Sequence, residues 1–220
     1  MNAFQTKCQA IKTKLAEIRY VPVLALNDVE VASQLATTLC KAGLPCAEVT
    51  FRTEQAAHVM AAMKKEQPNL LLGAGTVLSK QQVDEAIDAG VDFVVSPGLN
   101  PEVVEYCQSK NMPIFPGINN PSQVEQAMAL GLKVVKFFPA EASGGTAMLK
   151  SLQAVYPVDF MPTGGINGAN AANYLELKNV FCVGGTWMVN SQKLANQQYD
   201  DIALEIQALY GIQCKSEPSR

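Results

Sequence analysis

Histidine is almost absent from this chain of 220 residues, and His58 is the single one. His58 lies in the helix-like stretch 55–60, and we interpret it as a residue of a helix surface. A metal centre built on several histidines is therefore excluded. Magnesium held by carboxylates alone stays compatible with the composition. No motif in the sequence calls for a metal or another cofactor, and we expect none.

Cysteines are few and scattered, and none of them forms a C-x-x-C pair. Neither a zinc site nor a dithiol redox motif is therefore indicated. Several lie inside apolar runs, which favours buried free thiols. The six cysteines are Cys8, Cys40, Cys46, Cys107, Cys182 and Cys214.

A strong net charge and long apolar runs are both missing. The formal net charge is -3 and the sequence pI is about 5.3, which gives no electrostatic reason to bind nucleic acid or an anionic membrane. No run approaches the roughly 18 apolar residues of a membrane span. The N-terminal segment is polar and lacks the apolar core of a signal peptide. We therefore expect a cytoplasmic protein without nucleic-acid or membrane partners.

Short apolar runs that resemble buried strands recur along the chain. With 48% hydrophobic and 17% charged residues, the composition is that of a soluble globular protein. The runs are too apolar for a sheet with one face in water, which favours a parallel sheet covered by helices. The predicted strands are 21–26, 46–52, 70–77, 93–97, 113–117, 134–139, 159–162 and 180–185.

Amphipathic stretches alternate with these runs, and several end at a glycine, which is a common helix stop. The alternation within 220 residues predicts one domain, 1–220, folded as a (β/α)8 TIM barrel. An extra helix over 5–19 precedes the barrel, and 216–220 is interpreted as a polar tail. The other predicted helices are 31–41, 55–65, 81–89, 101–110, 123–130, 146–155 and 169–177.

Lys136 is the most informative residue, because it lies within the strand-like run 134–139. An unpaired ammonium group is costly to bury, and burial favours the neutral amine. A neutral lysine amine is a good nucleophile toward carbonyl carbons. Lys133 has the opposite strand parity and lies near the start of the run, so we expect it to be solvated. Lys136 is therefore the candidate catalytic residue, although a buried structural ion pair with Glu48 is compatible with the same pattern.

Polar side chains alternate along the second predicted strand. Glu48, Thr50 and Arg52 share one face, while Val49 and Phe51 share the other. We expect the polar face to point into the barrel, with Glu48 as a general acid or base and Arg52 as a clamp for a carboxylate. A structural Glu–Arg pair is the alternative interpretation.

Glycines gather at the carboxyl ends of three predicted strands, where barrel enzymes have their active sites. The third strand ends at Gly75, followed by the hydroxyl of Thr76. The last two strands end in the Gly-Gly pairs of 162–166 and 183–187, a type of turn that can surround a phosphate with backbone N–H groups. Tight turns without a ligand remain the alternative.

Two segments, 43–52 and 131–144, closely resemble the KDPG/KHG aldolase family, the 2-keto-3-deoxy-6-phosphogluconate and 4-hydroxy-2-oxoglutarate aldolases. Shorter matches follow in the same order at 73–77, 96–98, 116–118, 162–166 and 184–187, and the resemblance covers about residues 20 to 210. It implies a class I, Schiff-base aldolase that needs no metal or other cofactor. It also implies a homotrimer and a 2-keto acid phosphate as the small-molecule substrate.

The resemblance assigns roles to individual residues. Lys136 would form the Schiff base, and Glu48 would transfer protons. Three residues would hold the pyruvate carboxylate and the 2-keto end, namely Arg52, Thr76 and Thr163. Four would hold the substrate phosphate, namely Gly164, Gly165, Gly185 and Thr186.

Three other functions are each compatible with part of the pattern. A phosphosugar isomerase or epimerase shares the phosphate end of the fold, but it gives Lys136 no purpose and His58 is poorly placed for it. A 2-dehydro-3-deoxy-6-phosphogalactonate aldolase would differ in configuration at C4. A non-catalytic phosphate-ligand binding barrel would not need Glu48, Arg52 and Lys136 together. The sequence does not choose between the two aldolase substrates, or between Entner–Doudoroff sugar-acid breakdown and glyoxylate handling.

Overall fold

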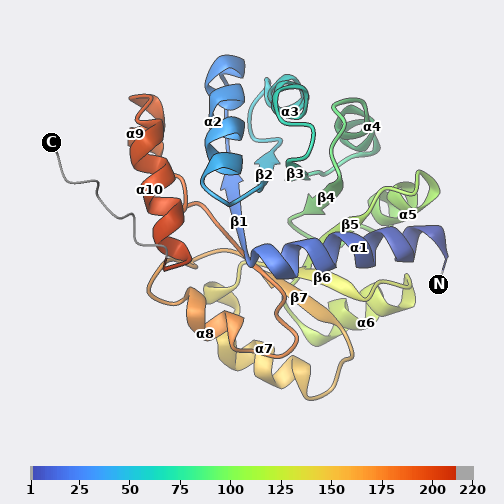
Figure 1. Ribbon diagram of the computed structural model, residues 1–220. Coiled ribbons are helices and arrows are strands. Elements are labelled where there is room, and N and C mark those ends of the chain that lie inside the picture. The colour runs from blue at the N-terminus through green and yellow to red at the C-terminus, as the bar shows by residue number, and fades with distance from the viewer. Residues whose placement is uncertain (1, 212–220) are drawn as a thin grey trace, which may run out of the picture.

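The computed structural model describes residues 2–211, in which strands and helices alternate along the chain (Figure 1). The strands pair in parallel in the order β7-β6-β5-β4-β3-β2-β1-β8. Parallel bridges from Phe160 to Val180 and from Thr163 to Gly184 join the two ends, so the sheet closes into a (β/α)8 barrel. The strands are β1 Tyr20–Leu24, β2 Cys46–Thr50, β3 Leu71–Gly75, β4 Phe93–Ser96, β5 Ile114–Ile118, β6 Val134–Phe137, β7 Asp159–Pro162 and β8 Val183–Gly185.

Helices surround the strands, and several begin at a side chain that caps the first turn. The side chains of Asp28, Ser79, Asn100 and Asn120 each accept a hydrogen bond from a backbone N–H of the following helix. The helices are α1 Ala3–Ile18, α2 Val29–Lys41, α3 Ala56–Glu66, α4 Lys80–Asp88, α5 Pro101–Ser109, α6 Pro121–Ala129, the 3-10 turn η1 Glu141–Ser143, α7 Gly145–Gln153, α8 Ala171–Leu175, α9 Ser191–Ala195 and α10 Tyr199–Leu209.

The barrel and its extra N-terminal helix are confirmed, with corrections to the predicted elements. Most strands are shorter than predicted. Four residues predicted at strand ends belong instead to the loops that form the cavity described below, namely Arg52, Thr76, Pro97 and Phe138. Helices α9 and α10 were not predicted. They pack against each other, and α10 also packs against α2, so they cover the barrel beside β8 and β1. The predicted tail 216–220 lies outside the described residues.

The core of the barrel is aromatic below the carboxyl ends of its strands. The rings of Phe93 and Phe115 lie 5.6 Å apart, and those of Phe115 and Phe181 lie 6.1 Å apart. Gly73 leaves room for this packing, because a Cβ there would be 2.4 Å from the Phe93 ring.

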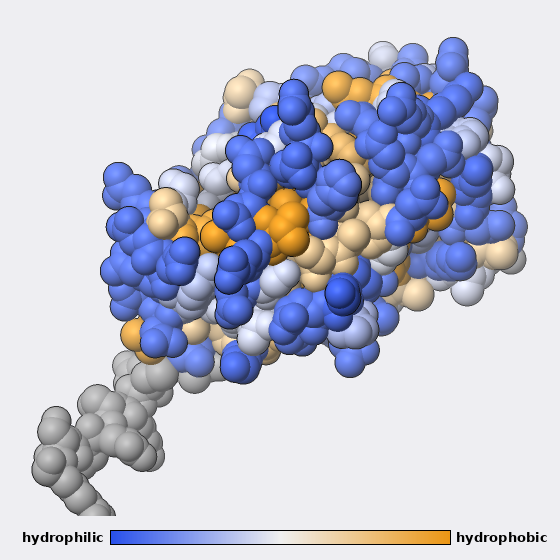
Figure 2. Space-filling view, turned by 90° about the horizontal axis from the view of Figure 1, so that it is seen from above, coloured by the Kyte–Doolittle hydropathy of each residue, from blue (hydrophilic) through white to orange (hydrophobic). Residues whose placement is uncertain are grey.

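On the face in Figure 2, hydrophilic residues surround small separate hydrophobic areas. Most large apolar side chains of the described residues are buried, and their burial stabilises the fold.

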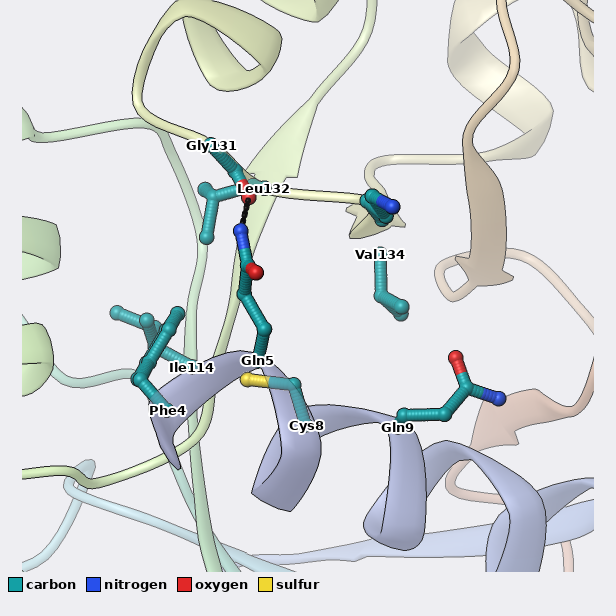
Figure 3. A pocket seen from close by; sticks show the side chains of 9 residues that line it. Phe4, Gln5, Cys8, Gln9, Ile114, Gly131, Leu132 and Val134 are labelled. Atoms are coloured by element: carbon teal, nitrogen blue, oxygen red, sulfur yellow. Dashed lines mark hydrogen bonds between the residues drawn. The ribbon is translucent and has the colours of Figure 1, made fainter. Parts of the chain in front are cut away.

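Helix α1 lies across the other end of the barrel, where β5 and β6 begin (Figure 1). Phe4 and Cys8 face Ile114 and Val134 around a small cavity, and Gln5 donates a hydrogen bond of 3.4 Å to the carbonyl of Gly131 (Figure 3). The cavity measures about 20 Å³, which is room for about one water molecule. This end of the barrel is therefore closed, and a substrate has to enter at the opposite end. Across residues 2–211, no helix has both the length and the apolar character of a membrane span.

Candidate active site

A cavity of about 280 Å³ opens at the carboxyl ends of the strands. A space of this size fits a small metabolite. In parallel barrels this end of the sheet carries the active site. The cavity is lined by Val23, Glu48, Thr50, Arg52, Thr76, Pro97, Lys136, Phe138, Thr163, Gly164, Gly165, Ile166, Gly185 and Thr186. All nine residues that the sequence singled out are therefore brought together here.

Lys136 and Glu48 form a buried ion pair at the floor of this cavity. The ammonium nitrogen of Lys136 donates to Glu48 Oε1 at 3.1 Å. Lys136 is 5% exposed and Glu48 0%, so water screens the pair weakly. Within residues 2–211, the second carboxylate oxygen, Oε2, has no hydrogen-bond partner. The carboxylate thus holds the amine with one oxygen and has the other available for a ligand or a water molecule.

Gly75 on the neighbouring strand makes room for the carboxylate. A Cβ at Gly75 would lie 2.3 Å from Glu48 Oε1, which is far closer than van der Waals contact allows. Gly117 on β5, which pairs in register with Lys136, makes room for the backbone of Pro97, because a Cβ there would lie 2.1 Å from the carbonyl oxygen of that residue. Gly75 therefore sets the space in which the carboxylate of the ion pair lies.

Arg52 is held at the wall of the cavity by a short chain of hydrogen bonds. Its Nε donates to the hydroxyl of Thr50 at 2.9 Å, and that hydroxyl donates to the carbonyl of Leu24 at 2.8 Å. Thr50 is 1% exposed, so it is a fixed support. The guanidinium is thereby oriented as a planar donor for a carboxylate that enters the cavity.

Two threonines offer hydroxyl groups on other sides of the cavity. Thr76 has φ 57°, a left-handed conformation that is rare for a β-branched residue and costs about 1–3 kcal/mol. Thr163 is buried, and its hydroxyl oxygen has no hydrogen-bond partner in the part of the chain that the structure describes. A strained backbone and an unpaired buried hydroxyl are both typical of residues that meet a ligand.

The two Gly-Gly turns form the rim. Gly164 and Gly165 both have positive φ, 101° and 77°, which glycine adopts without strain. Gly185 packs against the Trp187 ring so closely that a Cβ would lie 1.9 Å from it. Thr186 is exposed beside this contact. Small residues in these positions leave the backbone accessible to an anion.

Phe138 and Thr50 also line the cavity, without a role predicted from the sequence. The Phe138 ring lies 5.2 Å from the Lys136 nitrogen, a cation–π distance, and Thr50 supports Arg52. Strand alternation placed Thr50 on the inward face with Glu48 and Arg52, and the same parity joins Phe138 to Lys136. Lys133 is exposed and lines the small cavity at the closed end of the barrel, and His58 is exposed on α3. Neither contributes to the site.

Other reactive groups near the cavity are unsuited to proton shuttling. Burial, with Cys46 and Glu48 nearby, raises the pKa of the Cys182 thiol well above its usual value, so the thiol stays protonated and inert. Among the described residues, no three histidines, cysteines, aspartates or glutamates lie together as a metal site would require. The polar chemistry of the cavity therefore rests on the amine, the carboxylate, the guanidinium and the hydroxyls.

Residues 11–204 match the model of one protein family, KDPG and KHG aldolase. The chain is 46% identical over 195 residues to a 2-dehydro-3-deoxy-phosphogluconate aldolase of Haemophilus influenzae, which covers 88% of this chain and 92% of that protein. A protein of the same name from Treponema pallidum is 47% identical over 197 residues, or 89% of this chain and 94% of the relative.

A solved structure is similar throughout. It is a KDPG aldolase from Legionella pneumophila with pyruvate captured at low pH as a covalent carbinolamine intermediate. The two chains are 36% identical and superimpose with a TM-score of 0.87, covering 90% of this chain and 97% of the other. The likeness thus includes nearly the whole barrel.

Proposed function

Since the chain belongs to the KDPG and KHG aldolase family, we propose that it cleaves 2-keto-3-deoxy-6-phosphogluconate to pyruvate and glyceraldehyde 3-phosphate. The observation that carries the proposal is the buried contact of 3.1 Å between Lys136 and Glu48 at the floor of the cavity. It supports a class I mechanism, because the amine and a proton acceptor lie within one hydrogen bond of each other. The enzyme is accordingly a carbon–carbon lyase.

Schiff-base formation is the first half of the proposed mechanism. Lys136 passes a proton to Glu48 and attacks the 2-keto carbon as the neutral amine. The resulting carbinolamine loses water, with the departing hydroxyl taking up a proton, and leaves an iminium cation on Lys136. This cation is an electron sink next to the C3–C4 bond of the substrate.

Carbon–carbon cleavage is the second half. Glu48 removes the proton of the C4 hydroxyl, directly or through a water molecule, and the C3–C4 bond breaks. The aldehyde leaves, and the bonding electrons stay as an enamine on C3. Protonation of C3 and hydrolysis of the iminium release pyruvate and restore the amine. The unpartnered Oε2 of Glu48 is the oxygen available for this proton transfer within the described structure.

Binding of the substrate is assigned to the remaining residues. Three residues are proposed to hold the carboxylate and the 2-keto oxygen of the substrate, namely Arg52, Thr76 and Thr163. Their guanidinium and hydroxyl groups can donate hydrogen bonds, and they line the same cavity as Lys136. The phosphate is proposed to lie on the rim formed by Gly164, Gly165, Gly185 and Thr186. The same site would accept 4-hydroxy-2-oxoglutarate and release glyoxylate, because the reacting atoms are the same.

Steady-state cleavage tests the function. The purified protein should release pyruvate from the gluconate-derived substrate, and Lys136→Met should abolish this release. Lys133→Met is the matched control, because it removes an exposed lysine three residues away and should retain activity. No release from the gluconate substrate, or release from the galactonate epimer instead, would contradict the proposed specificity.

Thr186→Glu tests the phosphate rim, because it places a like charge where the phosphate is proposed to lie. We expect a large loss of activity on the phosphorylated substrate and a much smaller loss on 4-hydroxy-2-oxoglutarate. Equal losses of activity on both substrates would show that the phosphate does not bind at this rim.

One-domain organisation over 1–220, a homotrimeric assembly and a cytoplasmic location stay predictions. The first follows from the sequence pattern and the second from the family resemblance. Sedimentation equilibrium of the purified chain would test the assembly, with a mass near three times 23.6 kDa as the expected result.

A further inference from the structure

The segment that follows β6 supports the Gly-Gly turn after β7. The backbone N–H of Ala140 donates to the carbonyl of Thr163 at 2.8 Å, and that of Glu141 donates to the carbonyl of Gly164 at 3.1 Å. These two bonds continue the pairing of β6 with β7 beyond the strand ends. The loop that leaves the Lys136 strand and the turn 164–165 therefore form one unit.

The side chain of Glu141 packs directly against this turn. A Cβ at Gly165 would lie 2.7 Å from both Cβ and Cγ of Glu141, so the glycine and the glutamate stem are in close contact. The carboxylate accepts a hydrogen bond from the hydroxyl of Tyr174 on α8. Gly145 completes the packing, because a Cβ there would lie 3.2 Å from Glu141 Oε1 and 3.3 Å from the Tyr174 hydroxyl.

Tyr174 is a rigid partner for this contact. Its side chain is 0% exposed, so the hydroxyl is held in one place by the packing of α8. Burial, and then the neighbouring Glu141, raises the pKa of Tyr174, so the hydroxyl stays a donor throughout the neutral range. Glu141 itself is largely exposed and does not line the cavity, so its orientation depends on this bond.

A carboxylate so close to a turn proposed to bind phosphate needs an explanation, since like charges repel. The bond to Tyr174 resolves the conflict, because it directs the negative charge toward α8 while the stem of Glu141 supports Gly165. We propose that Glu141 and Tyr174 are positioning residues that fix the turn 164–165 and thereby set the affinity for a phosphorylated substrate. This inference rests on the proposed function.

Tyr174→Phe tests it by removing the hydroxyl while keeping the buried ring. We expect the KM for the phosphorylated substrate to rise roughly tenfold, as for loss of a hydrogen bond to a charged group. The kcat should stay within about twofold, and both constants for 4-hydroxy-2-oxoglutarate should be unchanged. The matched control is Tyr156→Phe, which removes a hydroxyl that donates to Glu125 at 2.8 Å elsewhere on the barrel and should change neither KM.

Two further measurements separate positioning from general weakening of the fold. Trp187, the one tryptophan of the chain, lies against Gly185 on the same rim, so its fluorescence should report binding of inorganic phosphate. The Tyr174→Phe variant should bind phosphate more weakly than the wild type, with the yield of the borohydride-trapped pyruvate adduct unchanged. Adding Glu141→Gln to Tyr174→Phe, which keeps the stem against Gly165 but removes the charge, should lower the raised KM again, because the released carboxylate repels the phosphate.

The outcomes distinguish this inference from the proposed function. Equal effects on both substrates, an unchanged KM, or a raised KM that Glu141→Gln does not lower would each overturn the positioning role. A wild-type protein that does not cleave the phosphorylated substrate would instead overturn the proposed function.

Discussion

The carboxylate oxygen Oε1 of Glu48 lies 3.1 Å from the Lys136 nitrogen, although 88 residues separate the two in the sequence. Glu48 is on β2 and Lys136 on β6, and the closed barrel brings these two strands' inner faces together. Both side chains are buried, so removing either one leaves an uncompensated buried group.

Glu48→Gln should lower kcat for cleavage by about 10²–10⁴-fold, because the amide keeps the shape of the carboxylate but cannot accept a proton. The KM should change much less, since Glu48 is not proposed to hold the substrate. Steady-state kinetics would check this. Glu105→Gln, which changes an exposed glutamate on α5, serves as the control and should retain wild-type kinetics. A kcat for Glu48→Gln within a factor of three of the wild type would show that Glu48 does not carry out the proton transfer.

Gly75→Ala should reduce activity strongly without any change to a polar group. The new methyl group would meet Glu48 Oε1 at 2.3 Å and force the carboxylate away from Lys136. Gly98→Ala is the matched control, because within residues 2–211 no atom lies within 4 Å of a Cβ at that position. We expect at least a tenfold difference in kcat/KM between the two variants. Equal activities would mean that the position of the carboxylate is unimportant.

The buried ion pair should make the fold less stable than a pair of apolar side chains would, although activity requires it. Lys136→Met alone should destabilise the fold by roughly 3–5 kcal/mol, because Glu48 loses its counter-ion. In the double variant Glu48→Leu/Lys136→Met, stability should return to the wild-type level or exceed it by about 1–4 kcal/mol, with no activity. Urea unfolding of the three proteins measures this. A double variant less stable than the wild type would show that the ion pair stabilises the barrel.

Alkaline pH should destabilise the protein through its buried thiols. Burial, with Cys8 nearby, raises the pKa of the Cys107 thiol from 9.0 to about 12. The folded state thus keeps a proton that the unfolded chain loses above pH 9, so stability is complete below that pH and falls as the pH rises toward 12. Between pH 8 and pH 10 the loss from this thiol is about 1.4 kcal/mol.

Urea unfolding at these two pH values tests the role of Cys107. The wild type should lose more stability than Cys107→Ala, by about that amount. Cys40→Ala, at a half-buried thiol, should change the pH dependence less. Identical pH dependence in wild type and Cys107→Ala would contradict the argument.

Strand alternation explains why much of the site could be predicted from the sequence. A period of two places Glu48, Thr50 and Arg52 on one face regardless of tertiary detail, and it separates Lys136 from Lys133. The Gly-Gly pairs at strand ends likewise indicated the rim. The sequence of α10 carries a helical signal as well, since Tyr199, Ile202 and Ile206 repeat at helical spacing.

Through-space contacts are the part that the sequence could not provide. The space that Gly75 leaves for Glu48 depends on how β2 and β3 align, and the left-handed backbone of Thr76 depends on how the loop after β3 closes. The hydrogen bond between Glu141 and Tyr174 joins residues that are 33 positions apart in the sequence. Glu141 lies in the turn η1 and Tyr174 in the helix α8. Such contacts follow from packing, which local patterns do not encode.

Trapping of the covalent intermediate tests the central claim most directly. The protein is incubated with pyruvate, reduced with borohydride and digested, and the modified peptide is identified by mass spectrometry. The account predicts a pyruvate-derived adduct on Lys136 in the wild type and in Lys133→Met, and no adduct in Lys136→Met. An adduct on a different lysine, or none in the wild type, would contradict it.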